Sequence, residues 1–497
     1  MILGVFKGPA IQWWALTPIL VLLGGALVLM VGAVLRPKLF PRGAYAAFTC
    51  LIALATVTLG FFLWHDIGEH GARSLLGGAL GFDRFSVFFT IAIASAVFLT
   101  ALVADDYLRR EDLDGCEVYA LLLLTAVGGI VMASANDLIV LFLGLETLSI
   151  ALYILAGSHA RRLQSRESAL KYFVLGGFSS AFFLYGVALT YGATGTTNLV
   201  KIQDFLQANV LLENGLLLAG LALMLVGLGF KVAAVPFHTW SPDVYEGAPS
   251  PVTGFMASAA KAAGFAGLLR VFVVCFATYA SDWRPAVFVL AVLTLVVGAV
   301  LAVVQTNVKR MLAYSSISHA GFILVAVQAA SPEGTAAALF YLLAYTFLVV
   351  GTFAVVTLVA RRGDAAYSLD DFRGLGRRRP VLALVFALLL LSQAGVPLTS
   401  GFLAKFEVIS AAVDRQSYAL AIIAMLSAVI AAYLYLRITV SMFLADPADD
   451  NTAPISVPAS AGFAIAIAAA FTIVAGVAPS VVLDAARHAV PILTATP

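Results

Sequence analysis

The sequence predicts an all-α integral membrane protein of about fourteen transmembrane helices. Of its 497 residues, 62% are hydrophobic and 11% are charged, whereas about 25% of the residues of a soluble domain are charged. The mean hydropathy is +1.01. Long apolar runs follow one another, and roughly 20 apolar residues suffice to cross a membrane. A β-barrel is excluded because its strands are short alternating segments, and no length is left for a soluble domain.

Fourteen apolar runs give the expected helices. They lie at 11–34, 43–64, 82–104, 116–134, 137–157, 170–193, 214–238, 251–275, 285–304, 309–330, 336–360, 380–412, 417–444 and 458–482. The first run is expected to be a retained helix and not a cleaved signal, since only Lys7 precedes it and basic residues follow it.

The charge distribution predicts the orientation of the chain. The total charge, +2, is too small to favour nucleic-acid binding, so the position of the charges is more informative. Loops after odd-numbered helices hold seventeen Lys and Arg residues, against five after even-numbered helices. The seventeen are Arg36, Lys38, Arg42, Arg109, Arg110, Arg161, Arg162, Arg166, Lys171, Lys309, Arg310, Arg361, Arg362, Arg373, Arg377, Arg378 and Arg379. Because basic loops stay in the cytoplasm, both termini are expected on the outer side.

Two expected helices, 214–238 and 380–412, contain helix breakers close to a lysine. The breakers are Gly227, Gly229 and Pro236 around Lys231, and Gly395, Pro397 and Gly401 before Lys405. Proline removes a backbone donor, and a break at membrane depth needs protein or water to satisfy the freed groups. Packing kinks are one interpretation. Corresponding broken helices with a nearby lysine favour a transporter built from repeats.

Isolated charges lie in the middle of apolar helices. Glu146 is central in 137–157, Lys261 is central in 251–275, and Lys231 lies inside a third helix. Each costs about 2.5–3.5 kcal/mol at the centre of a membrane helix, so these side chains should face the protein interior and one another. A lysine near a helix end can extend its side chain to the membrane surface, but Lys231 and Lys261 lie too deep for this explanation to be favoured. A static Glu146–Lys231 ion pair stays open, as does a movable glutamate that lets a lysine change its protonation state.

Three further titratable side chains lie within the expected helices. His319 lies within SSISHAGFILV, where neighbouring serines can hold water. These serines are Ser315, Ser316 and Ser318. An imidazole relay and a hydrogen-bonded core histidine are equally compatible with this pattern. His238 is expected at the membrane interface. Glu407 is two residues from Lys405, roughly 200° around the helix, and is therefore not placed on the same path.

Redox and nucleotide motifs are absent from the sequence. Cys50, Cys116 and Cys275 lack the spacing of a metal or iron–sulfur site and are expected to be packing residues. There is no GxGxxG after a strand, no P-loop and no pair of haem-type histidines. We therefore expect neither a metal nor a cofactor in this chain.

Two stretches, LGFKVAAVPFHTWSPDVYEGAPSP at 228–251 and NVKRMLAYSSISHAG at 307–321, closely resemble the antiporter-like membrane subunits of respiratory complex I. DVYEGAP is similar to the subunit N branch, the counterpart of the mitochondrial and chloroplast second subunit. The resemblance implies two inverted five-helix repeats, at 116–275 and 285–444, after an N-terminal region of residues 1–115 and before a last helix 458–482. It also implies that the essential glutamate is Glu146, the broken-helix lysine Lys231, the central lysine Lys261 and the exit lysine Lys405.

The resemblance further implies a complex that oxidises NADH, or a related donor, and reduces quinone. NAD, FMN, iron–sulfur clusters and quinone would belong to that complex, and the partners would be other antiporter-like and small membrane subunits, within the lipid of a bacterial plasma membrane. The expected function is proton translocation through Glu146, Lys231, Lys261, His319 and Lys405. A subunit of a multisubunit cation/proton antiporter is the alternative, against which DVYEGAP argues. A mere scaffold is disfavoured because it would gain stability from apolar residues at these positions.

Overall fold

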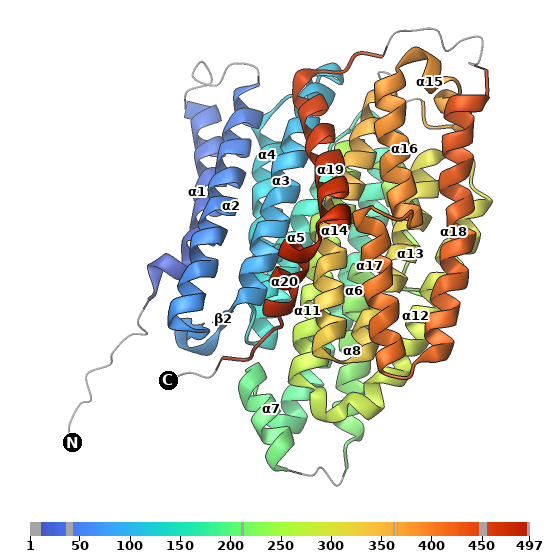
Figure 1. Cartoon of the computed structure of the whole chain (residues 1–497). Coiled ribbons are helices and arrows are strands. Elements are labelled where there is room, and N and C mark those ends of the chain that lie inside the picture. The colour runs from blue at the N-terminus through green and yellow to red at the C-terminus, as the bar shows by residue number, and fades with distance from the viewer. Residues whose placement is uncertain are drawn as a thin grey trace.

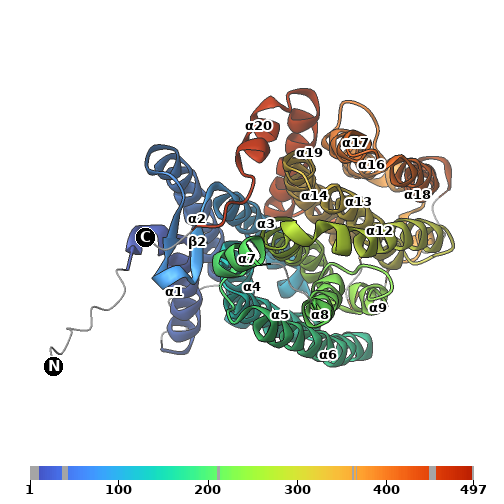
Figure 2. The same cartoon turned by 90° about the horizontal axis from the view of Figure 1, so that it is seen from below.

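The computed structural model describes residues 11–35, 43–209, 213–360, 363–364, 366–446 and 455–494. Helices running along one common direction form nearly all of it (Figure 1). Seen along the helix axes, α1 and α2 lie at one edge of the bundle, and α16, α17 and α18 lie at the opposite edge (Figure 2). The molecule is therefore a membrane bundle, as the sequence predicts.

Twelve helical segments within the described residues are long and apolar enough to cross a membrane. Eleven are continuous α-helices: α1 (Trp13–Leu35), α2 (Ala44–His70), α3 (Arg84–Arg110), α4 (Cys116–Ser134), α5 (Leu138–Ala156), α6 (Leu163–Thr194), α12 (Ala280–Val303), α13 (Val308–Ala329), α14 (Pro332–Val359), α18 (Tyr418–Leu444) and α19 (Ala459–Val477). The twelfth is built from α10 (Ser250–Phe255), a π-helical turn η3 (Met256–Ala260), α11 (Lys261–Leu268) and a second π-helical segment η4 (Leu269–Cys275). Each corresponds to one predicted apolar run.

Several helices extend beyond their predicted ends, and in α3 and α6 polar turns continue the helix outside the apolar run. α3 continues to Arg110, and Asp105 pairs with Arg109 one turn later. α6 begins at Leu163, and Glu167 lies 2.7 Å from Lys171 in its second turn. Ion pairs four residues apart stabilise exposed helical turns. Arg109, Arg110 and Lys171, assigned above to loops, are therefore helical.

The two predicted breaks are confirmed. α8 (Gly215–Lys231) ends at the lysine itself, and α9 (Trp240–Gly247) begins only after an irregular segment. α16 (Pro380–Ala394) is separated from α17 (Ser400–Asp414) by a turn in which Gly395 has a φ of 100°. α8 and α16 have 17 and 15 residues, so the count of fourteen crossings and the inverted repeats stay predictions.

Several short elements were not predicted. β1 (Arg73–Leu75) and β2 (Leu80–Phe82) form an antiparallel hairpin that encloses η2 (Leu76–Gly78). It lies at the same end of the bundle as α7 (Leu199–Ala208), and α15 (Leu375–Arg378) lies at the opposite end (Figure 1). The other short helices are η5 (Ala277–Tyr279), η6 (Leu369–Phe372) and α20 (Ser480–His488). Such segments are too short to show a periodic pattern.

A buried ion pair holds the hairpin end of the bundle together. Arg270 in η4 lies 2.6 Å from Asp83 before α3, and their side chains are 0% and 2% exposed. The backbone N–H of Ile492 also donates to Asp83, at 3.2 Å. Because breaking a buried pair leaves an uncompensated charge, these contacts fix the π-helical span that carries Lys261 against α3 and the C-terminal segment.

The orientation is testable with single cysteines at the two ends of the bundle. In a variant without native cysteines, Asp370→Cys should be labelled by a membrane-impermeant maleimide only from the cytoplasmic side, and Lys201→Cys only from outside. Asp370 is 74% exposed in η6, and Lys201 is exposed in α7. The expectation follows from the excess of basic residues in the loops at the η6 end. Labelling with the reverse sidedness would show that the topology is inverted.

Candidate functional site

Lys231 is a buried ammonium without a carboxylate partner. It is the last residue of α8, and its Nζ lies 5.9 Å from the ring centre of Tyr153 and 5.5 Å from that of Tyr172. Aromatic faces attract cations electrostatically. Within the described part of the chain, no carboxylate oxygen lies within 4.0 Å of this nitrogen. The direct ion pair with Glu146 that the sequence left open is therefore not formed.

Glu146 lies on the same helix as one of these aromatic partners. It precedes Tyr153 by seven residues in α5, so both side chains project from one face, two turns apart. One carboxylate oxygen of Glu146, Oε1, is buried and has no hydrogen-bond partner. The carboxylate and the ammonium are more than 4.0 Å apart, so a proton passing between them needs water, a neighbouring hydroxyl such as that of Tyr153, or movement of the side chains.

The break after Lys231 is covered by an aromatic cluster. The Trp240 ring stacks on Tyr172, with 4.5 Å between ring centres. Its indole N–H donates to the carbonyl of Phe230 at 3.1 Å, and this carbonyl also accepts from the backbone N–H of Ala233 at 3.0 Å. His238 lies in the break and is partly exposed, with a buried Nδ1 that lacks a partner. Its expected place at the membrane interface stays a prediction.

Lys261 connects the π-helical span to α13. It follows η3 directly, and π-turns are frequent at functional sites. Its Nζ donates to both the backbone carbonyl and the hydroxyl of Ser316, each at 2.5 Å, and lies 5.7 Å from the ring centre of Tyr345. Ser316, predicted above to hold water, contacts the lysine directly.

His319 is the centre of a hydroxyl network and not a lone histidine. Its Nδ1 lies 2.6 Å from the Tyr341 hydroxyl and its Nε2 lies 3.0 Å from the Tyr435 hydroxyl. The Tyr435 hydroxyl lies 2.6 Å from Ser315 Oγ. The imidazole therefore joins α13 to α14 and α18. This geometry fits a hydrogen-bonded core residue, and it also provides hydroxyls through which a proton can move.

Lys405 closes the second break. Its Nζ donates to the carbonyl of Ala394, the last residue of α16, at 2.9 Å and lies 5.0 Å from the ring centre of Phe322. A Cβ on Gly401 would lie 2.0 Å from the Ser392 carbonyl, so only glycine lets α17 approach α16 this closely. Lys405 is nine residues from the end of α17, about 14 Å along the axis.

The three partners on α13 lie along one face. Ser316, His319 and Phe322 are spaced by three residues, which places them side by side on a helix. Ser316 contacts Lys261 and Phe322 contacts Lys405, so the histidine lies between the two lysines. Lys261 is fourteen residues from the end of its span at Cys275, about 21 Å. Lys405 is therefore nearer the α7 end of the bundle than Lys261 is.

Glu407 faces a different space, as predicted. It lines a cavity of about 600 Å³ together with Glu333, Asp414 and Arg487, whereas Lys405 turns toward Ala394 and Phe322. The two side chains thus point away from each other across α17.

The family is settled by comparison with known proteins. A family model described as NADH:quinone oxidoreductase/Mrp antiporter, transmembrane, matches residues 135–431. The chain belongs to this family. It is 44% identical over 411 residues to NADH-quinone oxidoreductase subunit N of Trichlorobacter lovleyi, covering 83% of this chain and 84% of that relative. Within the family, it is therefore of the subunit N type.

Solved structures of this family share the fold. A chain of respiratory complex I from Thermus thermophilus with bound aureothin is 33% identical to this chain, with a TM-score of 0.79. The match covers 97% of this chain and 100% of that one. A chain of the Mrp complex from Dietzia sp. is 21% identical, with a TM-score of 0.81 over 95% of this chain and 97% of that one. The latter shares the fold alone, so the subunit N relatives favour the main interpretation over the antiporter alternative.

The tyrosines around the lysines were missed from the sequence. Tyr341 and Tyr345 are four residues apart and so share one helix face, which was a usable signal. Tyr153, Tyr172 and Tyr435 are scattered among apolar residues, and only the packing of distant helices brings them to the charged groups.

Lys405→Ala should lose most proton uptake while the complex assembles, because no titratable group then stands at the second break. Lys405→Glu should retain more uptake, since a protonated carboxyl can also donate to the Ala394 carbonyl. The measurement is proton uptake and quinone reduction in vesicles, normalised to assembled complex. Glu407→Gln, two residues away and facing the other cavity, is the control. Wild-type uptake by the alanine variant would make Lys405 structural.

Tyr435→Phe removes the hydroxyl that joins His319 to Ser315 and keeps the ring that fills the core. Two hydrogen bonds are lost, at about 1 kcal/mol each, so assembly should be retained while proton uptake falls several-fold. Tyr433→Phe is the matched control, because Tyr433 lies on the same helix and is 54% exposed. Equal uptake by both variants would remove Tyr435 from the path.

Proposed function

We propose that this chain is the proton-translocating subunit of an NADH-quinone oxidoreductase in the bacterial plasma membrane, and that it holds no redox centre. The observation that carries the proposal is the line of buried lysines. Lys231, Lys261 and Lys405 each lie against an aromatic ring without a carboxylate within 4.0 Å among the described residues. Such unpaired intramembrane charges are expensive and mark ion or proton pathways.

Each group has a chemical role in this proposal. Glu146 and Lys231 exchange a proton through water or a hydroxyl such as that of Tyr153, and movement of charge on the carboxylate changes the proton affinity of the lysine. Lys261 passes its proton to the hydroxyls beside Ser316, and His319 carries it along α13 through its two ring nitrogens. Lys405 releases it toward the outer side from the end of the line.

The redox groups are proposed to belong to partner subunits. NAD, FMN, iron–sulfur clusters and quinone would act elsewhere in the complex, and other antiporter-like and small membrane subunits would adjoin this chain. Its wide lipid- or partner-facing surface carries exposed apolar side chains such as Leu51, Phe61 and Val429. Both termini are proposed to lie on the outer side, in agreement with the basic loops at the other end.

The test is alanine substitution along the first half of the line. Glu146→Ala, Lys231→Ala and Lys261→Ala should each lower proton uptake roughly tenfold or more, with the complex still assembled. Glu146→Asp should be milder, because the acid survives. Proton uptake and quinone reduction are measured in inverted vesicles, with the amount of complex determined by immunoblot. Wild-type uptake in all three alanine variants, with assembly intact, would refute the proposed function.

A further inference from the structure

Lys309 is a fourth buried lysine built like the three of the proposed path. It is 0% exposed, its Nζ donates to the carbonyl of Ala248 at 2.6 Å, and it lies 4.6 Å from the ring centre of Tyr367. No carboxylate oxygen in the described ranges lies within 4.0 Å of it. Lys405 has the same environment, a carbonyl and an aromatic face. The assignment of Lys309 to a cytoplasmic loop was therefore wrong.

Lys309 lies at the N-terminal end of α13, before the residues of this helix that contact Lys261 and Lys405. It is the second residue of this helix and precedes Ser316 by seven residues and His319 by ten. A spacing of seven residues returns to the same helix face after two turns, about 10 Å along the axis. Lys309 thus lies over the Ser316–Lys261 contact, on the side of the bundle where the basic loops are.

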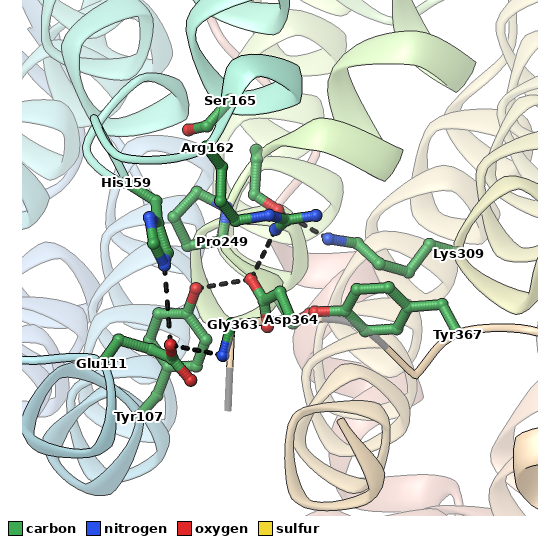
Figure 3. A network of polar contacts seen from close by, with 12 residues as sticks. Tyr107, Glu111, His159, Arg162, Ser165, Pro249, Lys309, Gly363, Asp364 and Tyr367 are labelled. Carbon is green, nitrogen blue, oxygen red and sulfur yellow. Dashed lines mark hydrogen bonds and ion pairs between the residues drawn. The ribbon is translucent and has the colours of Figure 1, made fainter. Parts of the chain in front are cut away.

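A buried carboxylate adjoins this lysine. Asp364 Oδ2 accepts hydrogen bonds from the Tyr107 hydroxyl at 2.6 Å and from Arg162 Nη1 at 2.8 Å. Its side chain is 0% exposed, and Oδ1 is buried without a partner. Lys309 and Tyr367 approach from one side and Tyr107 from the other (Figure 3). Asp364 is therefore held by one oxygen, while the other remains available for a proton.

Neighbouring contacts fix the segment that carries Asp364. Gly363 N donates to Glu111 Oε2 at 2.7 Å, and the same oxygen lies 3.6 Å from His159 Nε2 (Figure 3). The Tyr367 hydroxyl lies 3.0 Å from Ser250 Oγ. Burial, together with the charge of Asp364, raises the pKa of Tyr367 well above its ordinary value, so its hydroxyl stays protonated beside the carboxylate.

A surface cleft adjoins this network. A cleft of about 710 Å³ is lined by Asp364 and Tyr367, with Arg162, Glu246 and Asn307 around them. We propose that Asp364 and Lys309 form the cytoplasmic entrance of the proton path. When water enters from the cleft, its proton binds Asp364 Oδ1 and passes through water to the neutral amine of Lys309, which lies more than 4.0 Å from the carboxylate. The ammonium then releases it through water toward Ser316 and Lys261. This inference rests on the proposed function.

The decisive substitution is Lys309→Arg. Arginine keeps the positive charge and a donor for the Ala248 carbonyl but does not release its proton. A merely structural lysine is rescued by arginine, whereas an entrance group is not, so proton uptake should fall roughly tenfold or more. Lys309→His keeps a titratable group and should retain more uptake than Lys309→Arg. Lys201→Arg, at an exposed lysine, is the control. Wild-type uptake with Lys309→Arg overturns the proposal.

Asp364→Asn tests the proposed entrance independently of Lys309. It is therefore informative even when the complex with Lys309→Arg does not assemble. Asparagine can still accept from Tyr107 and Arg162 but cannot carry a proton, so uptake should fall while Asp370→Asn, at a 74% exposed carboxylate, has no effect. Wild-type uptake with Asp364→Asn refutes the entrance. The alanine variants of Glu146, Lys231 and Lys261 are measured in parallel. A loss of uptake in them with normal Lys309 and Asp364 variants refutes the entrance alone, whereas wild-type uptake in all three refutes the proposed function.

Discussion

An ammonium group in the membrane interior requires partners, because its hydration shell is lost there and few polar groups are free to replace it. Carbonyls within a regular helix already accept a bond from the backbone of the same helix, although a second donor can share one, as Lys261 does at Ser316. The break after α16 frees the carbonyl of Ala394, and this is the group that Lys405 contacts. The break therefore supplies Lys405 with an acceptor, and the lysine supplies the freed carbonyl with a donor.

The same constraint explains the close packing around the lysines. A Cβ on Gly401 would collide with the Ser392 carbonyl, and one on Gly128 in α4 would lie 2.4 Å from the Leu148 backbone nitrogen in α5. Small residues let membrane helices approach closely, so side chains on neighbouring helices meet without space for lipid. Asp83 and Arg270 fix the other end of the Lys261 span. Hydroxyl and ring contacts of a few ångströms are possible only in such a rigid frame.

Much of this arrangement was predictable because it depends on local composition. Apolar runs marked the twelve long helices, and glycine and proline marked both breaks. The contacts were not predictable where they join distant positions: Tyr107 and Asp364 are separated by 257 residues. Lys309 was counted with a basic loop because it stands at the very start of the expected helix 309–330, although Asn307 caps α13 before it by accepting from Lys309 N. α7 and the β1–β2 hairpin are too short for periodicity to show them.

The division between arginines and lysines argues for mobile protons over static packing. Arg270 pairs with Asp83 and Arg162 pairs with Asp364, and such guanidinium groups stay charged. The four buried lysines of the described residues, Lys231, Lys261, Lys309 and Lys405, have carbonyls, hydroxyls or rings around them and no carboxylate within 4.0 Å. A scaffold that needed fixed charges would pair these lysines in the same way. An amine without a carboxylate partner loses a proton more readily than one held in an ion pair, as the proposed function requires.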